Sequence, residues 1–464
     1  MTHEFSGKRI VVMGLGRFGG GIGVTRWLCK QGANVHVTDL ATRDDLAASL
    51  DALIGLPFTH RLGSHDECDL DGCNLLVVSP AVDKVKSDFF KAAIRRGIPW
   101  TSEMNLFLQR CRGQIVGITG TVGKSTTTAM IGAILESAHR STGWGHGRVW
   151  LGGNIGKSLL DELPSIGKRD IVVLELSSFQ LEDAAQIRRS PQIAVVTNLR
   201  DNHLDRHGTM PAYADAKANI YRFQSADDWV VMPKGEGIEH LPADWTDRRQ
   251  LVRYGIDATS RRIRIEGRAE TGLPTSDTAV QLAVPGLHNL QNAAAALAVA
   301  RILGVTDPAS CVALAHFAGL VHRLEFVREY QGVKYYNDSK ATTPDAAMTS
   351  LRAFDGGVVM MVGGSDKGSP FEELGRLIAQ RAKAAVCIGQ TAPQIAAAIV
   401  SAKCDTPGPE IRTATTFSEA IDSARELAEK GDVVLLSPAC ASYDWFKNYE
   451  ERGDHFKKTV LGWP

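Results

Sequence analysis

The stretch Gly117-Ile-Thr-Gly-Thr-Val-Gly-Lys-Ser-Thr-Thr-Thr128 decides the fold of the central part of this chain. It follows the strand-like Gln114-Ile-Val116 and runs into Ala129-Met-Ile-Gly-Ala-Ile-Leu135, which has helical character. A strand, a glycine-spaced loop, Lys-Ser and a helix, in that order, point backbone N–H groups and a positive helix end at one phosphate chain. We therefore predict a cradle for a nucleotide triphosphate.

Each residue type in this loop has a use in such a cradle. Gly120 and Gly123 let the backbone close around the phosphates. Lys124 reaches the outer phosphates, and the Ser125 hydroxyl ligates a magnesium ion. The general Gly-x-x-x-x-Gly-Lys-Ser/Thr pattern places a glycine where this chain has Ile118. The alternative is an ordinary glycine-rich turn between a strand and a helix.

Length and composition favour a three-domain protein that acts on small molecules. At about 150 residues per domain, 464 residues correspond to about three domains. Lys and Arg number 52, as do Asp and Glu, so no basic excess points to nucleic acid or to a membrane surface. The N-terminus lacks a signal-peptide core and no apolar run reaches ~18 residues. We expect a cytoplasmic monomer without membrane insertion.

The eight cysteines form no C-x-x-C pair, as expected for reduced thiols in the cytosol. His60, His65, Cys68 and Cys73 lie close together in the sequence, and a zinc site can be drawn through them. Their spacing matches no standard set of zinc ligands. We interpret them as ordinary loop and core residues.

The N-terminal region has the pattern of a Rossmann-like half. A strand at Lys8–Met13 leads into Gly14-x-Gly16-x-x-Gly19, and a second strand ends at Asp39, which is placed to accept from a ribose hydroxyl. A third strand, 74–80, ends in a polar turn at the sheet edge where ligands bind. The glycines serve the tight turn and the approach to a diphosphate, so NAD, a UDP-sugar and other nucleotide diphosphates are all candidates.

Two further blocks alternate apolar strands with helices. The expected buried strands are 171–176, 193–198, 358–362, 384–388 and 432–436. Glu175 lies at the end of the first of these, and because an unpaired buried carboxylate is costly, we expect it to face a cation. The glycine-rich segment 139–150, with its two tryptophans, is interpreted as a mobile loop.

Several motifs, spread in order over nearly the whole chain, together resemble the Mur ligases, and within that family the D-glutamate-adding members. They are Gly120–Thr126, Leu174–Glu182, His203–His207, Tyr213-x-x-x-Lys217, Pro285–Asn292, Gly319–Glu325, Asn337–Thr342, Gly363–Lys367 and Ser437–Asp444. The loop glycines of this family are displaced by one residue from the general spacing, which accounts for Ile118.

The resemblance implies an α/β protein of three domains. Residues 1–103 would form a Rossmann-like domain for a UDP substrate, 104–318 a central P-loop ATPase-type domain with a parallel sheet, and 319–464 a Rossmann-like domain that receives an amino acid and closes on ATP. It also implies ATP-dependent amide formation in cytoplasmic peptidoglycan precursor synthesis. The carboxylate of UDP-MurNAc-L-Ala takes the γ-phosphate, and the amine of D-Glu attacks the acyl phosphate.

The resemblance also assigns roles to individual residues. The implied catalytic residues are Lys124, Lys217 and His203, with Lys217 carbamylated. The implied Mg²⁺ ligands are Ser125, Glu175, His203 and Lys217. The implied ATP-binding residues are Gly120, Thr121, Val122, Gly123, Lys124, Ser125, Thr126, Asn289, Asn292, Arg323 and Asp338. The implied substrate contacts are Gly14, Gly16, Arg17, Phe18, Asp39 and Ser79 for UDP, Asn154 and Ser177 for the muramoyl end, and Thr342, Lys367, Ser442 and Tyr449 for D-Glu.

Some residues depart from the family's usual choices, and other functions stay open. Val122 replaces an Asn, Asn202 an Asp, Ala81 a Gly, Thr343 an Asn and Tyr449 a Phe. One alternative is a Mur-type ligase that adds a different residue. An NAD-dependent oxidoreductase is another, although it leaves the phosphate loop unexplained. The third is a nucleotide-driven switch protein without chemistry of its own.

Overall fold

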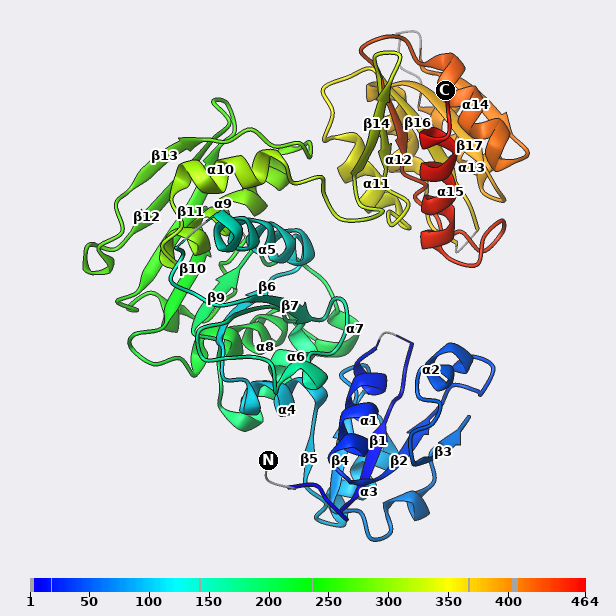
Figure 1. The fold of residues 1–464 in the computed structure, drawn as a ribbon. Helices are drawn as coiled ribbons and strands as arrows, with labels where there is room; N and C mark the ends of the chain where they lie inside the picture. The colour runs from blue at the N-terminus through cyan, green and yellow to red at the C-terminus, as the bar shows by residue number, and fades with distance from the viewer. Residues whose placement is uncertain (1–3, 18, 142, 236, 366–367, 403–407) are drawn as a thin grey trace. The chain divides into compact units, whose positions relative to one another are not determined.

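The computed structural model describes the chain from residue 4 to residue 464, apart from residues 18, 142, 236, 366–367 and 403–407. Three β-sheets with packed helices carry the fold, which confirms the predicted α/β class (Figure 1). The described residues form two compact units, one of 1–279 with 291–311 and the other of 280–290 with 312–464. The first two sheets share one unit, so the predicted boundary at 103 falls inside it, and the three-domain division remains a prediction.

The first sheet has five parallel strands in the order β3-β2-β1-β4-β5. Its elements are β1 (Arg9–Met13), α1 (Gly20–Lys30), β2 (Asn34–Asp39), α2 (Ala47–Asp51), β3 (Phe58–Leu62), β4 (Leu75–Val78), α3 (Asp88–Arg95) and β5 (Trp100–Thr101). The strand order reverses between β1 and β4. In open α/β sheets the crevice at such a reversal is the place where ligands bind.

The second sheet has eight strands in the order β13-β12-β11-β10-β9-β6-β8-β7. Its first half contains α4 (Glu103–Arg110), β6 (Gln114–Thr119), α5 (Lys124–Ser141), β7 (Val149–Gly153), β8 (Ile171–Glu175), α6 (Ser178–Ile187), β9 (Ile193–Val196), α7 (Leu204–His207) and α8 (Met210–Arg222). Its second half contains β10 (Trp229–Pro233), β11 (Leu251–Asp257), β12 (Arg262–Gly267), β13 (Ser276–Ala279), α9 (Leu287–Ile302) and α10 (Asp307–Ala315). Strands β6 to β11 are parallel, and β12 and β13 add an antiparallel edge.

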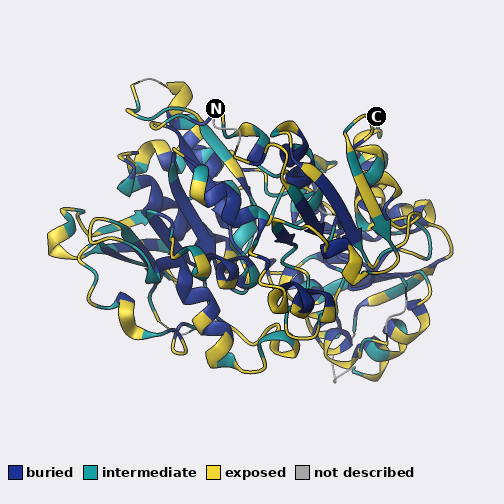
Figure 2. Ribbon diagram, turned by 90° about the horizontal axis from the view of Figure 1, so that it is seen from below, coloured by how far each residue is buried: buried dark blue, intermediate teal, exposed yellow. Residues whose placement is uncertain are grey.

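The third sheet has six strands in the order β14-β15-β19-β16-β17-β18, and only β14 is antiparallel to its neighbour. Its elements are β14 (Glu325–Tyr330), β15 (Val333–Asn337), α11 (Pro344–Leu351), β16 (Val358–Gly363), α12 (Glu372–Arg381), β17 (Ala382–Ile388), α13 (Ala392–Ser401), β18 (Glu410–Ala414), α14 (Phe417–Leu427), β19 (Val433–Leu436) and α15 (Tyr449–Leu461). The central strands β16 and β19 are buried and apolar throughout, as expected for parallel strands covered on both faces. Figure 2 shows such buried strands in dark blue.

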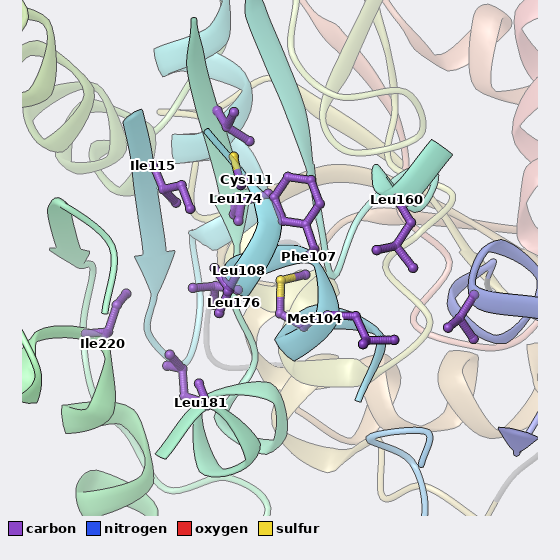
Figure 3. Packing of buried hydrophobic residues seen from close by; sticks show 14 of the residues in the cluster. Met104, Phe107, Leu108, Cys111, Ile115, Leu160, Leu174, Leu176, Leu181 and Ile220 are labelled. Atoms are coloured by element: carbon purple, nitrogen blue, oxygen red, sulfur yellow. The ribbon is translucent and has the colours of Figure 1, made fainter. Parts of the chain in front are cut away.

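One hydrophobic cluster runs from the first sheet into the second. It includes Val12 and Leu28 of the first sheet's layers, Met104 and Phe107 of α4, and Leu174 of β8. Figure 3 shows the part of this cluster around α4. Since α4 is the first element after β5, the chain passes from one sheet to the next through a buried helix rather than a flexible linker.

The segment 139–150 is anchored, whereas its sequence suggests a mobile loop. Helix α5 continues to Ser141, and β7 begins at Val149. Between them, the indole N–H of Trp144 donates to the carbonyl of Leu303 at 2.8 Å. In β7, the indole N–H of Trp150 donates to Asp170 at 2.9 Å. Both tryptophans therefore attach this segment to the second sheet's layers.

Glu103 at the start of α4 provides a test of how the first two sheets are joined. It accepts a hydrogen bond from the hydroxyl of Ser158, in the loop after β7. Burial raises the pKa of Glu103 from 4.5 to about 7. Between these pH values the folded chain holds a proton that the unfolded chain releases, so folding stability falls as the pH rises through this window.

We predict that Glu103→Gln, which cannot ionise but still accepts from Ser158, melts at a higher temperature than the parent at pH 8. Near pH 5 the two proteins should melt close together, because Glu103 is then protonated in the parent. Differential scanning calorimetry from pH 5 to pH 8 measures this difference. The exposed Glu162→Gln serves as the control, and a Glu103→Gln difference that does not change with pH would contradict the prediction.

Candidate active site

The predicted phosphate loop lies between β6 and α5, and its two glycines adopt conformations that other residues rarely take. Gly120 has φ 146°, and a Cβ there would lie 2.0 Å from the Thr197 hydroxyl. Gly123 has φ 86°, and a Cβ there would lie 2.4 Å from Asn292 Oδ1. The loop can therefore close only with glycine at both positions, as a close backbone approach to phosphates requires.

The remaining loop residues are held by hydrogen bonds that each join a side chain to a backbone group. Thr121 Oγ1 donates to the carbonyl of Arg200 at 3.1 Å. The N–H of Val122 donates to Asn198 Oδ1 at 3.1 Å, and its side chain is 52% exposed. Asn198, which follows β9, was not among the predicted residues, although its place after a buried strand is a usable signal. The absence of an Asn side chain at position 122 is thus compatible with a fixed loop backbone.

Lys124 folds back over the loop and Ser125 points to a carboxylate. Lys124 Nζ donates to the carbonyls of Gly120 and Thr121 at 3.0 and 2.9 Å. Ser125 Oγ donates to Glu175 Oε2 at 2.6 Å. Thr126 is buried in the first turn of α5. The loop, the lysine and the serine are thus brought together as predicted.

Glu175 is the acceptor on which the second sheet's polar groups converge. Only 3% of it is exposed, at the end of β8. Besides Ser125, Asn154 reaches it twice, from Nδ2 to Oε1 at 3.1 Å and from its backbone N–H to the carbonyl at 2.7 Å. Ser177, two residues after Glu175, caps α6 by accepting from the N–H of Gln180.

Lys217, on α8, is 1% exposed and lies against the start of the phosphate loop. Its Nζ donates to the Gly120 carbonyl at 2.8 Å and to the Thr119 hydroxyl at 3.4 Å, and it lies 4.6 Å from the centroid of the Tyr213 ring. Burial, helped by the positive charge of Lys124, lowers the pKa of Lys217 well below its usual value. Both causes shift this amine toward its neutral form.

His203 precedes the short helix α7 in a left-handed conformation, with φ 54°. Its ring lies 5.2 Å from the Phe179 ring and 6.3 Å from the Tyr213 ring. Burial and the charge of Lys217 lower its pKa, which favours an unprotonated nitrogen that can ligate a metal. A strained non-glycine residue beside such groups is a common feature of functional sites.

No three His, Cys, Asp or Glu side chains of the described residues gather so that they could hold a metal ion. The predicted Mg²⁺ set contains two such side chains, and the other two members supply a hydroxyl and the Lys217 amine. His60 and His65 bond to Arg43 and Thr38 instead.

A cavity of about 790 Å³ lies at the strand-order reversal of the first sheet and is lined by Gly14, Gly16, Asp39 and Ser79. Asp39 Oδ2 accepts from the N–H of Gly16 at 3.0 Å, so its carboxylate fixes the glycine turn. Arg17 pairs with Asp45 at 2.5 Å on the surface. Phe18 lies outside the described residues.

The second unit holds the remaining predicted residues. Asp338 is buried and accepts from Ser437 Oγ at 2.7 Å and from the N–H of Leu324 at 3.1 Å, and burial raises its pKa to about 6. Asn289 Nδ2 donates to the Pro285 carbonyl at 2.6 Å. The other predicted residues of this unit are partly exposed Arg323 and Thr342, buried Ser442, and Tyr449 at the start of α15. Lys367 lies outside the described residues.

Arg452 organises this part of the second unit, and the sequence analysis missed it. It is 1% exposed and donates to Ser339 Oγ and O, both at 2.9 Å, to Cys440 O at 3.1 Å and to Ala441 O at 3.3 Å. One side chain thus joins the loops that follow β15 and β19. Nothing in its local sequence distinguishes it from a solvated helix arginine.

Comparison with known proteins extends these observations over the chain. Models of a Mur ligase MurD-like N-terminal domain, a Mur ligase middle domain and a Mur ligase glutamate ligase domain match residues 8–102, 118–300 and 322–440. A UDP-N-acetylmuramoylalanine–D-glutamate ligase from Roseiflexus sp. (strain RS-1) is 41% identical over 98% of this chain and 99% of its own length. The chain belongs to the Mur ligase family. The resemblance seen in the sequence is thereby confirmed.

Further relatives support the same membership. A UDP-N-acetylmuramoylalanine–D-glutamate ligase from Pelotomaculum thermopropionicum is 39% identical over 99% of both chains. A solved Mur ligase structure, a UDP-N-acetylmuramate–alanine ligase from Thermotoga maritima, has a TM-score of 0.59 at 20% identity and covers 98% of this chain and 99% of its own. The latter likeness concerns the fold.

None of the described helices has the length and apolar character needed to cross a bilayer.

We predict that Gly123→Ala lowers the affinity for Mg·ATP by about 10- to 100-fold, as a backbone strain of ~1–3 kcal/mol implies. Calorimetric titration measures the affinity. Gly145→Ala is the matched control, because Gly145 has no heavy atom within 4 Å of its Cβ position. UDP binding, which we place in the first sheet, should be unchanged in both variants, and an unaltered ATP affinity in Gly123→Ala would exclude the phosphate-cradle assignment.

Proposed function

We propose that this Mur ligase adds D-glutamate to UDP-N-acetylmuramoyl-L-alanine, with ATP as the energy source, in cytoplasmic peptidoglycan precursor synthesis. The observation that carries the proposal is the 41% and 39% identity to ligases of that name over nearly the whole chain. We also take the substrates to be small molecules, with no nucleic-acid partner and no membrane insertion, and the protein to be a monomer.

In the proposed reaction, a carboxylate oxygen of UDP-MurNAc-L-Ala attacks the γ-phosphorus and ADP leaves. The amine of D-Glu then attacks the acyl phosphate carbon, phosphate leaves and the amine loses a proton. The cavity of the first sheet would hold the UDP end, with Asn154 and Ser177 toward the muramoyl end. Thr342, Lys367, Ser442 and Tyr449 would receive D-Glu.

The phosphate loop supports the ATP assignment. Gly120 and Gly123 let the loop pass closer to Thr197 and Asn292 than any residue with a Cβ could. Lys124 would exchange its two loop carbonyls for phosphate oxygens and so neutralise the transferring group. Asn289, Asn292, Arg323 and Asp338 would hold the rest of the nucleotide, as the sequence resemblance implies.

The donor set fits Mg²⁺ if Lys217 carries a carbamate. Ser125 and Glu175 already present oxygens 2.6 Å apart, and His203 offers an unprotonated nitrogen. A protonated Lys217 would repel the metal, whereas a carbamate adds the oxygen donors that this hard cation prefers. Bound Mg²⁺ would supply positive charge to the transferring phosphoryl group.

Phosphate release, assayed with each amino acid in turn, tests the proposed function. We expect release only when ATP, UDP-MurNAc-L-Ala and D-Glu are all present. Release with a different amino acid would indicate another Mur-type ligase, and release without the UDP substrate would indicate a nucleotide-driven switch. A change in nicotinamide absorbance would instead favour an oxidoreductase.

Lys217→Arg tests the carbamate separately. Arginine cannot form the carbamate and places a permanent positive charge in this buried position, so we expect at least a ~10²-fold loss of ligation. The melting temperature of the variant, measured alongside, shows whether the fold is kept. Carbon-13 NMR in labelled bicarbonate should show one carbamate signal in the parent and none in the variant. Acidification protonates the amine and should weaken the parent signal. An active arginine variant, together with a parent that gives no signal, would remove Lys217 from the site.

A further inference from the structure

Arg206, on α7, connects the second sheet to the loop that lines the cavity of the first. Its guanidinium donates to three successive carbonyls, those of Pro80 at 3.3 Å, Ala81 at 3.1 Å, and Val82. These residues follow β4 closely, and two of them line the cavity. The planar guanidinium meets the three carbonyls through two of its nitrogens, in a fork geometry that the compact ammonium of lysine does not reproduce.

The same guanidinium also contacts the rings beside the phosphate loop. Its Cζ lies 4.5 Å from the centroid of the Phe179 ring, a cation–π distance. The Phe179 ring lies 5.2 Å from the ring of His203 and 5.2 Å from that of His207, and is parallel to the latter within 7°. The cavity loop is therefore linked to His203, the candidate metal ligand, through two intervening side chains, those of Arg206 and Phe179.

On the cavity side, the loop is packed directly against the glycine turn. Gly14 has φ 93°, and a Cβ there would lie 2.7 Å from the Cβ of Ser79. Gly14, Ser79, Ala81 and Val82 all line the one cavity. A ligand that fills this cavity must therefore contact the segment that Arg206 holds.

We propose that Arg206 is a positioning residue that couples occupancy of the first sheet's cavity to the placement of His203. The inference rests on the proposed function, since it takes the cavity as the UDP site and His203 as a ligand of the phosphate-side metal. Coupling between two binding sites is reciprocal, so UDP tightens the binding of Mg·ADP and Mg·ADP tightens that of UDP by the same factor.

Titration calorimetry of the full chain with Mg·ADP, alone and in saturating UDP, measures this factor. In the parent we expect UDP to tighten Mg·ADP binding about 5-fold or more, the usual lower range of coupling. In Arg206→Ala and in Phe179→Leu, UDP should change the affinity for Mg·ADP by a factor of about one, while each ligand still binds alone. Arg206→Lys keeps the charge but not the three-carbonyl contact, so its factor should fall below half that of the parent.

Asp161→Asn is the matched control for the general attachment of the two sheets. Asp161 pairs with Lys30 at 2.9 Å and Arg26 at 3.6 Å, both on α1, far along the sequence from the cavity loop. This variant should keep the factor of the parent, and unchanged melting temperatures would show that all variants are folded.

The outcomes separate the inference from the function on which it rests. A parent that binds UDP and Mg·ADP without coupling would overturn the role of Arg206 alone. The role of Arg206 would also be overturned if Arg206→Ala and Phe179→Leu both kept the coupling factor of the parent. Loss of the coupling factor in Asp161→Asn would overturn it in the same way. A parent that binds neither UDP nor Mg·ADP would contradict the proposed function itself and the inference with it.

Discussion

The burial of the Glu175 carboxylate is the constraint on which the candidate site depends. A carboxylate with 3% exposure costs free energy unless hydrogen-bond donors reach it, and Ser125 and Asn154 provide them. One donor comes from the first turn of α5 and the other from the end of β7. The need to satisfy one buried group therefore brings the phosphate loop, β7 and β8 into a single arrangement. Lys217, buried nearby, meets a comparable need through the Gly120 carbonyl.

Much of the fold could be predicted from the sequence because fully covered parallel strands leave continuous apolar runs. The expected strand 171–176 is β8 (Ile171–Glu175), and 358–362 is β16 (Val358–Gly363). The glycine positions were equally predictable, since the backbone itself requires them at Gly120 and Gly123. Local sequence patterns predicted the segment 139–150 less well, because Trp144 and Trp150 bond to residues distant in the sequence.

Residues inside the recognised motifs to which the sequence assigned no role of their own act through long-range contacts. Arg206 meets carbonyls more than a hundred residues earlier, and a backbone carbonyl has no sequence signature. Phe179 packs against the Arg206 guanidinium, stacks on His207 and meets His203 edge-on, yet in the sequence it is one apolar residue of a helix. Asp39 is predicted to meet a ribose, and what the structure shows is that its carboxylate accepts from the N–H of Gly16. Such contacts depend on how whole sheets pack.

The position of Arg452 in α15, after both loops that it joins, has a consequence for synthesis on the ribosome. The loops that it joins, at Ser339 and at Cys440–Ala441, belong to strands that emerge earlier than α15. Translation proceeds from the N-terminus, and domains fold as they emerge. The first compact unit can thus mature while the second still lacks the side chain that joins its loops. A nascent chain stalled before α15 would carry a complete phosphate loop, whereas the loops after β15 and β19 would still lack the side chain that joins them.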